Sequence, residues 1–142
     1  MNQQLVAKES ITIRAPIDKV WEALVDPRMI SQYMFGTQVI TDWKEGSPIV
    51  WKGEWKGKRY EDKGMILEVV PKQRIQYTHF SPLSGLPDQP ENYHTVTIEL
   101  AEAGGLTHVA LAQDNNASEE ARDHSEKNWG MMLASLKKLL EE

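Results

Sequence analysis

The sequence has 142 residues, of which 40% are hydrophobic and 26% charged, and its formal net charge is −5. This length fits one domain, so we expect residues 1–142 to form a single domain, and the composition excludes a disordered chain. The acidic balance argues against nucleic acid as a partner, and without a long apolar run no membrane insertion is expected. Because there is no cysteine, disulfides and thiolate metal sites are excluded, and a cytoplasmic location is the default expectation.

The first third of the chain predicts one strand and two short helices. Apolar and polar residues alternate with a period of two over residues 3–15, which is typical of a strand. Pro16 ends that strand and can begin a helix over residues 17–24. Pro27 can open a second short helix, which Gly36 would end.

The middle of the chain reads as consecutive strands joined by short turns. Alternating patterns bounded by glycine and proline predict strands at residues 39–43, 49–55, 59–70, 74–80, 94–102 and 106–113. Consecutive strands with such short connections must be mostly antiparallel. Residues 81–91 form a longer connection, which predicts either a lid or a mobile loop.

The last segment predicts a long amphipathic helix. Asn116 and Glu119 fit a capping box at its start. Residues at helical spacing then form one stripe: Ala121, Ser125, Trp129, Met132, Leu136 and Leu140. A helix of this kind is not stable alone, so the stripe must pack on another element.

One face of the predicted sheet is apolar and needs a cover. Its residues are Met65, Leu67, Val69, Ile75, Tyr77, Val96, Ile98, Leu100, Val109 and Leu111. The C-terminal helix is the only predicted element long enough to cover that face. We therefore predict an α+β helix-grip fold, in which a curved antiparallel sheet of about seven strands surrounds the long helix, with two short helices after the first strand.

A curved sheet can leave a gap beside the helix, and the alternation selects residues for its walls. The predicted ligand-binding residues are Trp51, Trp55, Met65, Leu67, Tyr77, His79, Trp129, Met132 and Leu133. For Trp51 and Trp55, packing in the core or across the outer sheet is the alternative interpretation.

Continuing the Met65–Leu67 face toward the start of its strand adds Glu61 and Lys63 to the gap. An inward Glu61 could then act with His79 as an acid–base pair. Alternatively, Glu61 and Lys63 are solvated where the strand leaves the core, with Gly64 marking a bulge that changes the register. If Lys63 or Arg59 stands at the mouth of the cavity, the ligand should carry a carboxylate.

Motifs for metal or cofactor chemistry are missing from the sequence. The four histidines lack the short spacing of a metal pair, although His79 and His94 could meet across two strands. Sequences for a nucleophile elbow, a dinucleotide fingerprint or a phosphate-binding loop are also absent. We therefore expect no metal, no cofactor and no assigned catalytic residue.

Four stretches carry a family resemblance: residues 11–24, 41–51, 64–71 and 128–137. They resemble the SRPBCC superfamily, also called START-like or birch-allergen-like. Within it, the chain is similar to the branch resembling the C-terminal domain of the activator of the heat-shock-protein-90 ATPase. The resemblance implies a helix-grip fold with an internal cavity, and it carries over no catalytic motif.

The sequence favours noncatalytic binding of a small hydrophobic or aromatic molecule between the sheet and the C-terminal helix. One alternative is a chaperone-linked interaction module for the stress response, with a chaperone as its partner. The other is a cyclase or aromatase using the same cavity through Glu61 and His79.

Overall fold

The structure is a computed structural model that describes residues 5–55, 57–82 and 85–141, and the side chain of Trp55 lies outside this described part. Within it, seven strands form one antiparallel sheet in the order β1-β7-β6-β5-β4-β3-β2. The strands are β1 (Leu5–Ile13), β2 (Gln38–Ile40), β3 (Pro48–Trp55), β4 (Lys58–Val70), β5 (Arg74–His79), β6 (His94–Ala103) and β7 (Leu106–Asn116).

The described helices are α1 (Ile17–Val25), α2 (Pro27–Tyr33) and α3 (Glu119–Glu141). Asp26 caps α2, because its carboxylate accepts a 2.9 Å hydrogen bond from the backbone N–H of Arg28. Ser118 caps α3 in the same way, through a 3.1 Å bond from the N–H of Ala121. The predicted cap at Asn116 is wrong, because this residue ends β7 and its amide donates to the carbonyl of Leu5.

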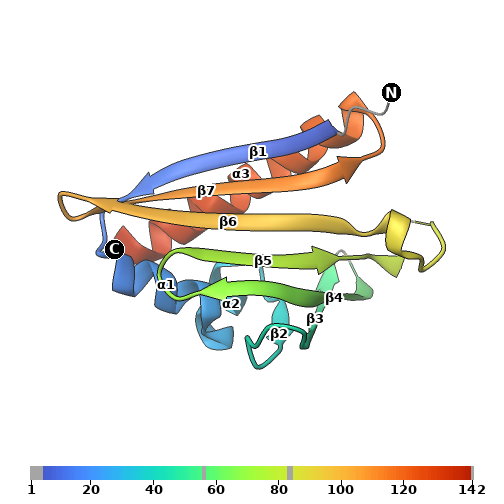
Figure 1. The fold of residues 1–142 in the computed structure, drawn as a ribbon, viewed down its shortest axis with the longest axis horizontal. Coiled ribbons are helices and arrows are strands. Elements are labelled where there is room, and N and C mark those ends of the chain that lie inside the picture. Colours follow the sequence, from blue (N-terminus) through green and yellow to red (C-terminus); the bar gives the residue numbers. More distant parts are fainter. Residues whose placement is uncertain (1–4, 56, 83–84, 142) are drawn as a thin grey trace.

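Helix α3 runs behind β1 and β7 along one face of the sheet, with α1 near its C-terminal end (Figure 1). The predicted helix-grip fold is confirmed, including the two short helices after the first strand. The predicted second strand is shorter than expected and ends at Ile40. Trp43 has a φ of 61°, a left-handed conformation that cannot continue a strand.

The core lies between the sheet and the three helices. Each of the seven strands places a buried β-branched side chain in it, and β3 also adds Trp51. From α3, the core takes Met132, Leu133 and Leu136. Packing against the sheet therefore stabilises α3, which would not be a stable helix on its own in water.

Strand β4 comes very close to β5 at Gly64, and the pairing of the two strands there determines which residues face the interior. A Cβ atom at this position would overlap the backbone carbonyl of Thr78 on β5, so only glycine allows this close approach. A bulge between Ile66 and Glu68 then shifts the pairing of β4 with β5. Before the bulge, Tyr60, Asp62 and Ile66 therefore face the interior, while Met65 and Leu67 face outward.

In the described part of the chain, no helix has the length and apolar character needed to cross a membrane. The described residues of the 81–91 connection include a 3-10 turn at Pro90–Asn92, which leads into β6.

Candidate functional site

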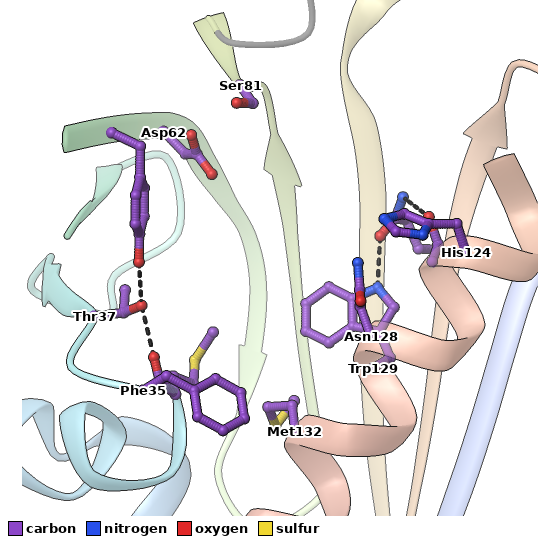
Figure 2. Close-up of a pocket in the computed structure, with 12 residues that line it drawn as sticks. Phe35, Thr37, Asp62, Ser81, His124, Asn128, Trp129 and Met132 are labelled. Carbon is purple, nitrogen blue, oxygen red and sulfur yellow. Dashed lines mark hydrogen bonds between the residues drawn. The ribbon is translucent and has the colours of Figure 1, made fainter. Parts of the chain in front are cut away.

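A cavity of about 600 Å³ opens between α3, β4 and the segment that follows α2. Figure 2 shows Trp129 and Met132 of α3 on one side of it and Phe35, Thr37 and Asp62 on the other. The walls combine aromatic rings and methionine side chains with a few polar groups, which is typical of small-molecule sites.

A recess of about 150 Å³ continues this cavity inward. It adds Trp51, Tyr77 and His79, and it shares five lining residues with the larger space: Met34, Thr37, Tyr60, Asp62 and Trp129. Because the two spaces share these walls, the recess is the inner end of one hollow.

The recess contains a carboxylate and an imidazole in direct contact. The Nε2 atom of His79 lies 2.9 Å from Oδ2 of Asp62, and their side chains are 28% and 17% exposed. Since a carboxylate only accepts, His79 donates this bond from Nε2. The second oxygen of Asp62, Oδ1, is buried and has no hydrogen-bond partner among the described residues.

Aromatic rings surround His79. Its ring centroid lies 5.0 Å from that of Trp51, and Trp51 lies 5.1 Å from Tyr77. His94 lies 6.2 Å from His79 across β5 and β6, as predicted, but its Nδ1 donates to the carbonyl of Asp114. Burial raises the pKa of Tyr77 far above its ordinary value, which keeps this hydroxyl neutral.

Tyr60 forms the wall between the recess and the α2 side. Its hydroxyl lies 2.5 Å from Oγ1 of Thr37, which itself donates to the carbonyl of Met34 at 2.8 Å. Tyr60 therefore donates to Thr37 and keeps its own lone pairs for another donor. Gly53 on β3 allows this placement, because a Cβ atom there would overlap the Tyr60 ring.

On the α3 side, hydrogen bonds fix the position of Trp129. Its indole Nε1 donates to Oε1 of Gln113 on β7 at 2.6 Å. The amide nitrogen of Gln113 in turn lies 3.4 Å from Oδ1 of Asn116 and 3.5 Å from Oγ of Ser125. A polar network thus holds an aromatic wall in one orientation.

The structure brings together five of the predicted site residues. They are Trp51, Tyr77, His79, Trp129 and Met132, and all of them line the hollow. Leu133 is buried in the core and does not line these two spaces. The side chain of Trp55 lies outside the described part of the chain.

The predicted inward orientation of Met65 and Leu67 is wrong. Their side chains are 48% and 40% exposed on the outer face, beside Pro90 and Tyr93. The cause is the register of β4 before the bulge, which turns its odd-numbered residues outward.

The same register separates Glu61 from His79. Glu61 faces outward, 3.7 Å from the Nζ atom of Lys52, and Lys63 pairs with Asp88. The alternative interpretation from the sequence, that both residues are solvated, is confirmed. The carboxylate that meets His79 is the neighbouring Asp62.

Sequence reasoning missed several wall residues. Tyr60 and Asp62 share the parity of Ile66, so counting from Ile66 across Gly64 would have placed them inward. Phe35 and Thr37 follow a helix in an irregular segment, where no periodicity exists to indicate a direction. Phe35 has a φ of 57°, a conformation that bulky residues seldom adopt and that is found more often near functional sites.

These features define a helix-grip protein with an interior cavity beside its long helix. Residues 14–141 match the family described as "Activator of Hsp90 ATPase homolog 1-like protein". The chain therefore belongs to this family, within the SRPBCC superfamily, as the resemblance implied.

Solved structures agree with this assignment. The solution structure of ChR145 from Cytophaga hutchinsonii is 59% identical, covers 99% of this chain and 97% of that chain, and has a TM-score of 0.87. CalU16 from Micromonospora echinospora is 21% identical over 97% of this chain and 85% of that chain, with a TM-score of 0.72. The Aha1 dimer from Colwellia psychrerythraea is 19% identical over 96% of each chain, with a TM-score of 0.73. These last two show the fold alone. Among curated proteins, none matches the chain.

Proposed function

We propose that this protein binds a small, mainly apolar or aromatic molecule in the hollow beside α3, without catalysing a reaction. The observation that carries the proposal is the cavity of about 600 Å³ with its inner recess of about 150 Å³. A volume in this range suits a ligand of drug-like size.

The chemistry of the walls supports an aromatic or polycyclic ligand. Trp129 offers a flat surface held by Gln113, while Met34 and Met132 can adapt to an irregular outline. Phe35 is 55% exposed at the edge of the cavity, where a bound ligand would cover part of its ring.

A dye-uptake experiment tests the proposal. N-phenylnaphthylamine is uncharged and fluoresces strongly in apolar surroundings, and we expect the purified protein to bind it with saturation. Asn128→Trp would place an indole in the mouth of the cavity, so it should reduce uptake at least tenfold. Lys127→Trp is the matched control, because Lys127 is the exposed neighbour on the same helix and does not line the cavity. Absence of uptake by the wild-type protein, or equal uptake by both variants, would overturn the proposal.

The contact between Asp62 and His79 favours cyclase-type catalysis as a second candidate. A carboxylate bonded to an imidazole in a mostly apolar recess is a plausible base for removing a proton next to a carbonyl group. Exchange of the methyl protons of acetophenone in deuterium oxide, followed by NMR, measures this capacity. Faster exchange with the wild-type protein than with His79→Asn would support catalysis, and equal rates would favour binding alone.

A chaperone partner is supported by the family description alone. A pull-down from cell extract with the wild-type protein as bait tests it. Recovery of a chaperone would support an interaction role, whereas recovery of none would leave ligand binding as the better-supported function.

A further inference from the structure

In the described part of the chain, the sheet ends at β1 on one side and at β2 on the other. Strand β2 has three residues, Gln38–Ile40, whereas β1 has nine, Leu5–Ile13. An edge strand presents backbone N–H and C=O groups with which a strand of another molecule can pair, and a very short edge offers few of them. The long edge at β1 is therefore the one at which the sheet could be extended.

Two backbone N–H groups along the free edge of β1 are bonded to carboxylates of α3. The N–H of Lys8 donates to Oε2 of Glu126 at 3.0 Å. The N–H of Arg14, which directly follows the strand, donates to Oε2 of Glu141 at 2.8 Å. Because backbone groups alternate in direction along a strand, the N–H groups of these even-numbered residues point away from β7. Both carboxylates therefore occupy donors that an added strand would use.

A lysine of α3 occupies a backbone acceptor at the same edge. The Nζ atom of Lys137 donates to the carbonyl of Thr12 at 2.8 Å and to Oε2 of Glu141 at 2.6 Å. Glu126, Lys137 and Glu141 are all half-buried, in contrast to the exposed charged residues of the same helix. The exposed ones are Glu119, Glu120, Asp123, Lys127 and Lys138. The three side chains therefore pack against the strand instead of extending into solvent.

The lengths of the helix and the strand match over this contact. Residues 126–141 span about 22 Å of helix, and residues 8–14 span about 20 Å of strand. Helix α3 runs in the same direction as β1 (Figure 1). Gly130 lies between the contacts, and a Cβ atom there would be 3.5 Å from the carboxyl carbon of Glu9, so the helix passes close to the strand. All three contacts therefore form along one straight stretch of helix.

We propose that Glu126, Lys137 and Glu141 act as an edge guard, which occupies the backbone groups of β1 that a second copy of the chain would need for pairing. The guard keeps the sheet from extending between molecules, and none of its residues lines the hollow. A second copy is a suitable strand, because antiparallel pairing of two β1 strands about Ser10 would place no like charges opposite each other.

Hydrogen exchange of single backbone amides, followed by NMR, tests the guard in the wild-type protein. The N–H of Ser10 points to the same edge and has no hydrogen-bond partner among the described residues. After correction for intrinsic rates, the amides of Lys8 and Arg14 should exchange at least about tenfold more slowly than that of Ser10. Equal exchange of the three amides would overturn the proposal.

Variants of Glu126 assign the protection to its side chain. Glu126→Ala should accelerate the exchange of the Lys8 amide at least about tenfold and leave that of Arg14 unchanged. Glu126→Gln should retain most of the protection, because its amide oxygen still accepts a hydrogen bond. An unchanged Lys8 rate in Glu126→Ala would also overturn the proposal.

The mass in solution tests whether the guard prevents association. The triple variant Glu126→Ala, Lys137→Ala and Glu141→Ala should associate as its concentration rises, whereas the wild-type protein should not change in mass over the same range. Adding Ser10→Pro should restore the wild-type behaviour, because proline removes an edge N–H without removing a bond to β7. Light scattering after size-exclusion chromatography measures both, and thermal melting checks that the variants fold.

A second triple variant is the matched control. Glu119→Ala, Glu120→Ala and Lys127→Ala remove the same charges from exposed positions of the same helix, so the wild-type mass should be kept. An unchanged mass of the guard variant, equal association of the control, or association that Ser10→Pro does not reverse would each overturn the proposal. The exchange measurement on the wild-type protein holds whether or not the triple variants fold.

Discussion

The two halves of α3 face the same sheet and produce opposite results. In the C-terminal half, Leu133 and Leu136 are buried in the core, with Leu139 and Leu140 packed against it. In the N-terminal half, Trp129 and its neighbours line a hollow. One helix therefore serves as a core element at one end and as the wall of a cavity at the other.

The residues of the sheet that face α3 also differ between the two halves of the helix. Opposite the hollow, the interior presents Asp62, His79 and Gln113, whereas the packed core is almost entirely aliphatic and aromatic. Polar groups of this kind are costly in a closed core and useful in a site. The difference teaches that the polar side chains facing inward mark where the sheet and the helix stop packing.

The largest effect should come from Leu136→Ala in the packed half. This side chain is fully buried, so its loss removes apolar contacts and leaves a void that costs about 2–5 kcal/mol of unfolding free energy. Urea denaturation measures this loss. Binding of N-phenylnaphthylamine under folding conditions should remain unchanged, and a weakened dye affinity would contradict the separation of the two halves.

Met132→Ala, one helical turn earlier, should cost less, about 1–2 kcal/mol. Met132 is buried but already borders the cavity, so removing it enlarges an existing space. Dye affinity should change measurably, in contrast to Leu136→Ala. Equal losses of stability in the two variants, with no change in binding, would mean that the halves of α3 do not differ.

The packed half could be predicted from the sequence because it repeats at regular intervals. Leucines at helical spacing and the alternation along β5, β6 and β7 define the inner faces of these elements without further information. In the predicted order of elements, the C-terminal helix is the one element long enough to cover the apolar face of the sheet. For this reason the helix-grip fold could be predicted.

The hollow half could be predicted only in part. Trp51, Tyr77, His79, Trp129 and Met132 were found by alternation and helical spacing. Met65 and Leu67 misled, because an apolar outer patch has the same pattern as an apolar inner one when a bulge shifts the register by one residue. The same shift explains why Asp62, and not Glu61, is the carboxylate that contacts His79.

An alkaline titration compares the core with the recess. Burial raises the pKa of both Tyr33, in the core, and Tyr77, in the recess, far above the ordinary value of about 10. The unfolded chain therefore loses these protons first as the pH rises. Stability should be unaffected below about pH 10 and should fall above it, by about 1.4 kcal/mol per pH unit for each buried tyrosine.

Tyr33→Phe should reduce this alkaline loss while costing about 1 kcal/mol at neutral pH, because the hydroxyl donates to the carbonyl of Ala23 at 2.9 Å. Tyr77→Phe should reduce the alkaline loss equally if the recess excludes water as well as the core does. A smaller reduction for Tyr77→Phe would show that solvent reaches the recess, and urea denaturation at several pH values distinguishes the two results.

The smallest effect is expected at Gly130, which lies between the two halves of α3. Glycine in the interior of a helix lowers the stability of the folded state by about 0.5–1 kcal/mol relative to alanine. A Cβ atom here would lie 3.5 Å from the carboxyl carbon of Glu9, an ordinary contact, so Gly130→Ala should raise the unfolding free energy by about this amount. Ala134→Gly, at an exposed position one turn later, is the matched control and should lower it similarly. If Gly130→Ala instead slows dye uptake while stabilising the fold, the junction between the packed and hollow halves must bend for the ligand to enter.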